Sequence, residues 1–138
     1  MVRQIVYISS SPSRDEPKEI AAILAAARRN NAAEGITGLL AFVDGSFLQV
    51  LEGEAGAVSR RFEIIRKDAR HSFVIKLLDR DIPERMFPDW SMAWRACPAD
   101  HPAAAEVRTI ARRGEIAPGA GDAALEALIA SVFRSVPA

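Results

Sequence analysis

Tyr7 and Gln49 stand out in the sequence because each is a polar side chain inside a run of apolar residues. Tyr7 is the only tyrosine of the chain and lies in RQIVYIS, whereas Gln49 lies in FLQVLEG. Asn30 and Asn31 add two carboxamides near the end of a helical pattern. A phenol and carboxamides supply hydrogen-bond donors and acceptors but no activated nucleophile. Together with Met92 they predict a slot for a flat heteroaromatic ligand that has an imide edge.

A strand and a helix near the start of the chain would bring these side chains together. The β-branched and aromatic run at 3–9 predicts a strand, and 15–33 predicts a helix that Gly35 ends. Asn31 falls on the apolar stripe of this helix, four residues after Ala27. A buried carboxamide costs about 1 to 3 kcal/mol unless it is hydrogen-bonded, so a polar partner is expected opposite Asn31.

Residues 36–43 and 46–53 predict a hairpin, because Asp44-Gly45 favours a two-residue turn. That register places Gln49 opposite Leu40 in the middle of the sheet. The remaining patterns predict a helix at 55–68, strands at 72–82 and 90–96, and C-terminal helices at 99–113 and 122–136.

This order of elements predicts an α+β, ferredoxin-like fold. A five-stranded mixed sheet would carry two helices on one face and the C-terminal helices on the other. The strand at 36–43 lacks alternation, which is typical of a strand buried on both faces. We expect residues 1–97 to form the ligand-binding domain and residues 98–138 to form a helical extension that packs on the sheet.

Composition argues against several classes of protein. The 138 residues carry 18 Lys and Arg against 18 Asp and Glu, which argues against a nucleic-acid partner. Cys97 is the only cysteine, so neither a disulfide framework nor a cysteine-based metal cluster is expected. No apolar run approaches the roughly 18 residues of a membrane span. A cytoplasmic protein without a metal site or a membrane contact is expected.

Five blocks of sequence resemble the BLUF family, which comprises blue-light sensors that use a flavin. They cover about residues 2–96 in the order and spacing of that family. The blocks are VYIS with Tyr7, Asn30-Asn31 before GITGLL, FLQVLEG with Gln49, DARH at 68–71, and FPDWSM with Trp90 and Met92.

The resemblance implies FAD as the cofactor, with FMN as an alternative. Tyr7 and Gln49 would be the photoactive pair, whereas Trp90 and Met92 would belong to the strand that relays the signal. The implied flavin contacts are Tyr7, Ser9, Asn30, Asn31, Ile36, Gln49, Asp68, Arg70 and His71. Ile64 stands where many relatives carry Arg or His, which leaves Arg61 or Arg66 as candidates for the phosphate tail.

The implied function is a blue-light photoreceptor that is not itself an enzyme and that signals to an unidentified downstream protein. Excited flavin is a strong oxidant, and Tyr7 can deliver an electron and a proton. Gln49 can reverse its hydrogen bonds by rotation or tautomerisation, because an amide has a donor end and an acceptor end. A homo-oligomer, either a dimer or a larger assembly, is also expected. Two alternatives remain: a ferredoxin-like regulatory or interaction module that binds another ligand without photochemistry, and a flavin-dependent redox enzyme.

Overall fold

The computed structural model describes residues 1–10, 17–43, 45–67, 73–89, 91–114 and 122–134. One five-stranded sheet has the strand order β4-β1-β3-β2-β5. Its strands are β1 (Val2–Ser10), β2 (Thr37–Val43), β3 (Ser46–Gly53), β4 (Phe73–Ile82) and β5 (Ala93–Cys97). The helices are α1 (Pro17–Glu34), α2 (Ala55–Arg66), α3 (Pro102–Arg113) and α4 (Asp122–Phe133).

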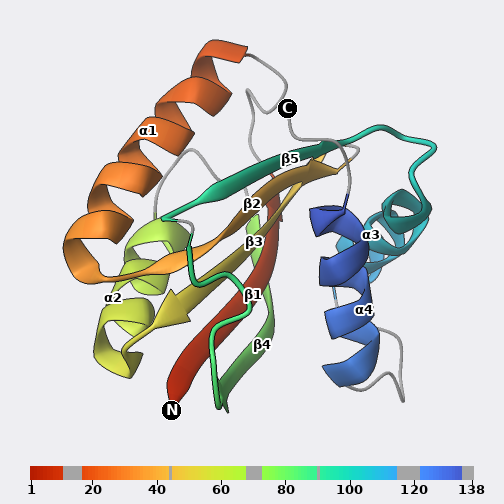
Figure 1. Ribbon diagram of the computed structural model, residues 1–138. Helices are drawn as coiled ribbons and strands as arrows, with labels where there is room; N and C mark the ends of the chain where they lie inside the picture. Colours follow the sequence, from red (N-terminus) through yellow and green to blue (C-terminus); the bar gives the residue numbers. More distant parts are fainter. Residues whose placement is uncertain (11–16, 44, 68–72, 90, 115–121, 135–138) are drawn as a thin grey trace.

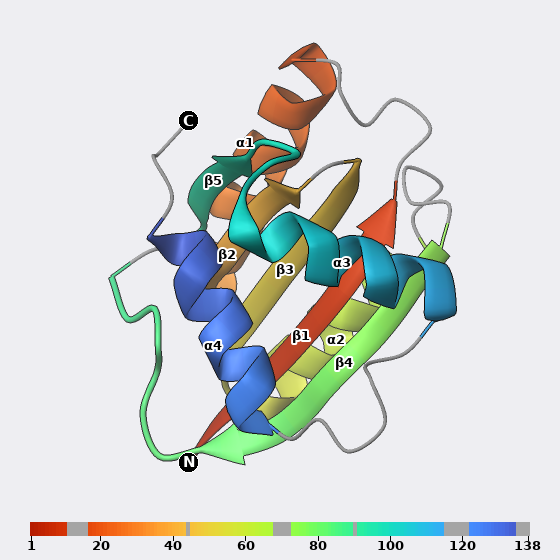
Figure 2. The ribbon, with the colours of Figure 1, turned by 90° about the vertical axis from the view of Figure 1, so that its right-hand side faces the viewer.

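Two helices cover each face of the sheet. Figure 1 shows α1 and α2 on one side, with α3 and α4 on the other. Figure 2 looks onto the face that α3 and α4 cover. Adjacent strands are antiparallel except β2 and β5, which are parallel, so the sheet is mixed. The predicted α+β architecture is therefore confirmed.

Glycines set the turns that align the central strands. Gly35 ends α1 with a φ of 69°, and Gly45 adopts a φ of 87° between β2 and β3. Both values lie in the left-handed region that glycine adopts without strain. The hairpin pairs Val43 with Ser46 and Leu40 with Gln49, so the predicted register is confirmed.

The sheet separates two apolar cores. Ile5 and Tyr7 of β1 pack with the α1 and α2 side, whereas Val6 and Ile8 pack with the α3 and α4 side. This alternation follows from the pleat of a strand. β3 is buried along its whole length and β2 along most of its length, as expected for strands covered on both faces.

The last strand begins three residues later than the sequence predicted, at Ala93. The carbonyl oxygen of Ser91 accepts a hydrogen bond from Asn31 Nδ2 at 3.0 Å. The carbonyl oxygen of Met92 accepts one from Arg28 Nε at 3.1 Å. Side chains of α1 bind this backbone, and pairing with β2 starts only at Ala93. Placing Met92 on the strand was therefore wrong, and Trp90 lies outside the described residues.

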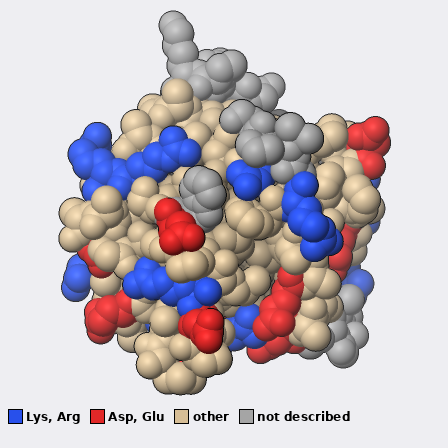
Figure 3. Space-filling model, viewed as in Figure 1, with Lys and Arg blue, Asp and Glu red and all other residues tan. Residues whose placement is uncertain are grey.

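Charged side chains of both signs are interspersed on the face that Figure 3 shows. Within the described part of the chain, no helix combines the length and the apolar character needed to cross a bilayer. The same residues contain no group of three or more His, Cys, Asp or Glu side chains placed to hold a metal ion.

Candidate functional site

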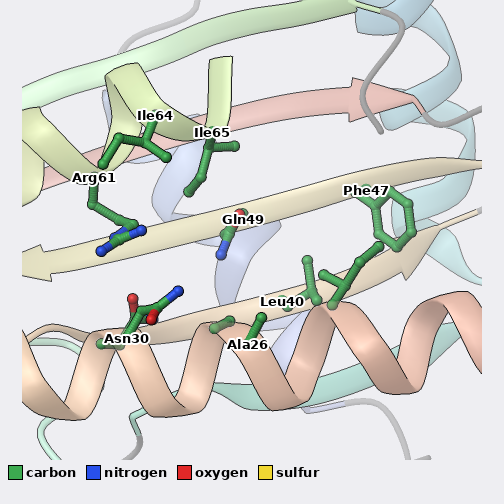
Figure 4. Close-up of a pocket in the computed structure, with 11 residues that line it drawn as sticks. Ala26, Asn30, Leu40, Phe47, Gln49, Arg61, Ile64 and Ile65 are labelled. Carbon is green, nitrogen blue, oxygen red and sulfur yellow. The ribbon is translucent and has the colours of Figure 1, made fainter. Parts of the chain in front are cut away.

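A pocket lies between α1 and α2, over the middle of the sheet. Figure 4 shows Gln49 between the two helices, with Arg61 and Asn30 toward one end and Phe47 toward the other. The pocket has a cavity volume of about 130 Å³ and is partly open to solvent. Small-molecule sites are mostly apolar. The lining residues are Ile23, Ala26, Ala27, Asn30, Asn31, Leu40, Phe47, Gln49, Arg61, Ile64 and Ile65.

Tyr7 and Gln49 are direct partners across β1 and β3. Residues opposite each other in an antiparallel pair share a face, with Cβ atoms about 4.5 to 5.5 Å apart. Gln49 lines the pocket and is 5% exposed, whereas Tyr7 is fully buried and its ring packs edge-on against Phe62 at 5.4 Å between centroids. The sheet therefore sets the phenol beside the amide.

The hydroxyl of Tyr7 has no hydrogen-bond partner among the described residues. Burial raises the pKa of this hydroxyl, because the phenolate would lose its hydration. Tyr7 is therefore a neutral phenol at neutral pH. A buried hydroxyl without a partner costs about 1 to 3 kcal/mol, so this site suits a molecule that restores the missing hydrogen bond.

Gln49 donates from Nε2 to the thioether sulfur of Met92 at 3.8 Å. Met92 is 2% exposed and packs in the same apolar core as Tyr7. A thioether is a weak acceptor, so this hydrogen bond can be exchanged at little cost. Gln49 thus connects the pocket to the segment that leads into β5.

Asn31 has the polar partner that the sequence predicted. It is 1% exposed, lines the pocket, and donates to the carbonyl oxygen of Ser91. Arg28, one turn earlier on α1, binds the carbonyl oxygen of the next residue, Met92. The pocket wall and the segment before β5 are therefore held together by α1.

The α2 wall carries one charged and two apolar side chains. Arg61 forms an ion pair with Glu34 of α1, and these side chains are only 16% and 21% exposed. Glu34 balances the charge of Arg61, so Arg61 is not expected to attract the phosphate tail of a flavin nucleotide. Arg66 pairs with Glu63 at 2.7 Å on the exposed surface. Ile64 is 50% exposed although it lines the pocket, so a bound ring would cover apolar surface that now faces water.

The sequence-derived candidates fall into three groups. Asn30, Asn31 and Gln49 line the pocket, and Tyr7 is the strand partner of Gln49. Ile36 is buried in the adjacent core, and Ser9 is buried on β1, but neither is among the lining residues. The rest lie outside the described residues: Asp68, Arg70, His71 and Trp90.

Sequence reasoning did not assign the apolar residues of α1 to the pocket. Ile23, Ala26 and Ala27 line it together with the predicted Asn30, at spacings of three, one and three residues. This spacing follows one helical face and was a detectable signal. The ion pair of Arg61 with Glu34 left no such signal, because its partners lie 27 positions apart.

A family model described as sensors of blue-light using FAD, named BLUF, matches residues 2–93. Photoactivated adenylate cyclase subunit beta of Euglena gracilis is 36% identical over 89 residues, which are 64% of this chain and 10% of that protein. The blue light- and temperature-regulated antirepressor BluF of Escherichia coli K12 is 31% identical over 87 residues, 63% of this chain and 22% of that protein. The chain thus spans less than a quarter of these two relatives.

Solved structures match over nearly the whole chain. The photo-activated state of BlsA aligns with a TM-score of 0.79 and 27% identity, covering 100% of this chain and 99% of that chain. The dark state of BlrB, described as a BLUF protein, aligns with a TM-score of 0.74 and 27% identity, covering 98% and 97%. The similarity therefore includes the region of α3 and α4.

Proposed function

The chain belongs to the BLUF family, the sensors of blue light that use FAD, and we propose that it is a photoreceptor whose FAD ring lies between α1 and α2. The observation that carries this proposal is the pairing of Tyr7 with Gln49 directly beside the pocket. The sheet places a redox-active phenol next to an amide whose hydrogen bonds can be reversed.

The residues of the pocket fit a flavin ring. Its mostly apolar walls, which are open to solvent at the mouth, suit a flat aromatic system. Asn31 and Gln49 offer amide groups to the polar edge of the ring, and the orphaned hydroxyl of Tyr7 lies next to Gln49. Ile64 supplies apolar surface in place of a cation, so it would bind the flavin ring through van der Waals contact and not through a charged group.

When bound, the flavin absorbs blue light and becomes a strong oxidant. Tyr7 is held as a neutral phenol, so it can give up an electron together with the proton on its oxygen and recover both in the dark. Gln49 carries a donor at Nε2 and an acceptor at Oε1, and rotation or tautomerisation exchanges their roles. Rotation replaces the N–H that now faces the sulfur of Met92 by Oε1, whereas tautomerisation moves one of the two hydrogens of Nε2 to Oε1.

We propose that the segment before β5 carries this change toward α3 and α4. Met92 touches Gln49 through its side chain, while its carbonyl oxygen is held by Arg28 of α1. Rotation of the amide would turn Oε1 toward the sulfur of Met92, and the repulsion between these two acceptors would bias the position of this segment. Residues 1–97 would then act as the sensor and residues 98–138 as the output, toward a separate downstream protein and without catalysis by this chain. A homodimer or a larger homo-oligomer is part of the same proposal.

The test is the absorption spectrum of the FAD-loaded chain before and after blue light. We expect a red shift that reverses in the dark without net reduction of the flavin. Gln49→Leu removes the amide and leaves an apolar side chain in the same strand, so this variant should bind FAD without the shift. Light-driven bleaching in place of the shift would favour the redox enzyme, and failure to bind FAD would favour a module for another ligand.

A further inference from the structure

Glu52 of β3 anchors the connection between β4 and β5 from the face of the sheet opposite the pocket. Its carboxylate is fully buried and accepts hydrogen bonds from the backbone N–H of Phe87 at 2.9 Å and of Met86 at 3.2 Å. The amide Nε2 of Gln4, its strand partner on β1, donates to the same carboxylate at 2.8 Å. The three donors to this carboxylate are thus uncharged, and two of them belong to the connecting segment, whose Arg85 also donates to the backbone carbonyl of Glu52 at 3.2 Å.

Gln4 extends this hydrogen-bond chain to the edge of the sheet. Its Oε1 accepts from Arg80 Nε of β4 at 2.9 Å. Arg80 then binds the start of α4, through Asp122 at 3.1 Å and Glu126 at 2.8 Å. A continuous polar chain therefore leads from the backbone of the β4–β5 connection to the first turn of α4. We call Glu52, Gln4 and Arg80 the far-face chain.

The other end of α4 contacts the same connection. The ring of Phe87 packs edge-on against Phe133 at 5.0 Å between centroids. Arg95 of β5 donates from Nε to the carbonyl oxygen of Phe133 at 2.8 Å and stacks on its ring at 4.5 Å. Figure 2 shows α4 lying across this face of the sheet. The helix is therefore held at both ends by residues in or next to the segment that Glu52 anchors.

The anchored segment leads to Met92, whose side chain contacts Gln49. Met92 lies five residues after Phe87, and its sulfur takes the hydrogen bond of Gln49. Gln49 and Glu52 lie on the same strand and face opposite sides of the sheet, toward the pocket core and the far-face core. Side chains of β3 thus hold this connection from both faces of the sheet.

We propose that Glu52 is a positioning residue that holds the β4–β5 connection against β3 and, through Gln4 and Arg80, couples displacement of Met92 to the first turn of α4. This inference rests on the proposed function, because the displacement begins when Gln49 exchanges its hydrogen bonds. Leaving a buried carboxylate without its hydrogen bonds is costly, so movement of the Met86–Phe87 backbone either carries the far-face chain with it or breaks it.

Hydrogen exchange of α4 in the FAD-loaded chain, in the dark and under blue light, tests this coupling. Glu52→Gln replaces one carboxylate oxygen by an NH₂ group, which cannot accept, so the side chain can pair with at most two of the three donors. Arg80→Gln leaves the Glu52 anchor intact and removes the ion pairs to α4. Glu54→Gln is the matched control, because Glu54 also accepts from two backbone N–H groups but caps α2, away from α4.

The wild type and Glu54→Gln should show a light-dependent change in exchange across residues 122–133. Glu52→Gln and Arg80→Gln should keep the red shift of the flavin and lose that light-dependent change. If Glu52 had only a structural role, Glu52→Gln would alter the hydrogen exchange of α4 in the dark but would keep the difference between light and dark. Arg80 is 17% exposed at the sheet edge, so Arg80→Gln provides the test if Glu52→Gln does not fold.

Two results would overturn the coupling while leaving the proposed function intact. One is a full light-dependent change of α4 in both far-face variants. The other is a wild-type red shift with no change in α4 exchange. Absence of any red shift in the wild type would instead remove the proposed function and this inference together.

Discussion

Replacing Tyr7 by Phe should stabilise the FAD-free protein while abolishing its light response. The substitution removes one hydroxyl from a fully buried position where it has no partner among the described residues, and it keeps the ring against Phe62. An unpaired buried hydroxyl costs about 1 to 3 kcal/mol, so the free energy of unfolding should rise by that amount. With FAD bound, the hydroxyl regains a partner and the gain should disappear.

Alkaline pH should enlarge the difference in stability between the wild type and the Tyr7→Phe variant. The pKa of a tyrosine in the unfolded chain is about 10, and burial raises the pKa of Tyr7 in the folded chain. The stability of the wild type is thus unaffected by this group below about pH 10 and falls above it, by about 1.4 kcal/mol per pH unit. The Tyr7→Phe variant has no ionisable hydroxyl, so it does not lose stability in this way.

Urea unfolding of the FAD-free proteins, at neutral pH and above about pH 10, measures both effects. Tyr7 is the only tyrosine, so tyrosinate absorbance of the wild type reports on this residue alone and should appear only on unfolding. If Tyr7→Phe lowers the stability of the FAD-free protein by more than about 1 kcal/mol, the hydroxyl is bonded within the fold and the reasoning is wrong.

Three further perturbations follow from the site. Asn31→Ala removes the hydrogen bond to Ser91, so it should lower the free energy of unfolding by about 1 to 3 kcal/mol. The same variant should bind FAD more weakly in a fluorescence titration. Unchanged affinity for FAD would contradict the place of Asn31 in the pocket. Met92→Leu keeps the buried volume, so stability should change by less than about 1.5 kcal/mol, but the dark-recovery rate should change because Gln49 loses its acceptor. Glu54 caps α2, and hydrogen bonds from two backbone N–H groups hold its pKa below the ordinary value. The contribution of Glu54 to stability is present above about pH 4.3 and is lost as the pH falls. The thermal stability of the wild type should therefore drop more steeply in acid than that of Glu54→Gln. Parallel curves of melting temperature against pH would refute this.

Local patterns were sufficient for most of the fold and for the centre of the site. Asp44-Gly45 fixed the hairpin register, which in turn placed Gln49 opposite Leu40. The amide of Asn31 on an apolar stripe correctly indicated a buried polar group with a partner opposite. These features depend on neighbours in sequence, so turn chemistry and periodicity reveal them.

Features that depend on distant parts of the chain were missed. β5 begins late because side chains of α1, about 60 positions earlier, take the carbonyl groups of Ser91 and Met92. Glu52 within FLQVLEG gave no sign of its partners 34 and 35 positions later. Long-range hydrogen bonds of this kind follow from the packing of the sheet, which no local periodicity encodes.

The central claim is that light reverses the hydrogen bonds of one buried amide. The chain contains two glutamines, Gln4 and Gln49, so glutamine labelled with ¹⁵N at the side chain gives two amide signals, and Gln49→Leu assigns them. In the FAD-loaded wild type, blue light should shift the Gln49 amide signal, and darkness should restore it with the same time course as the absorption spectrum. A red shift of the flavin with an unmoved Gln49 signal would contradict the account.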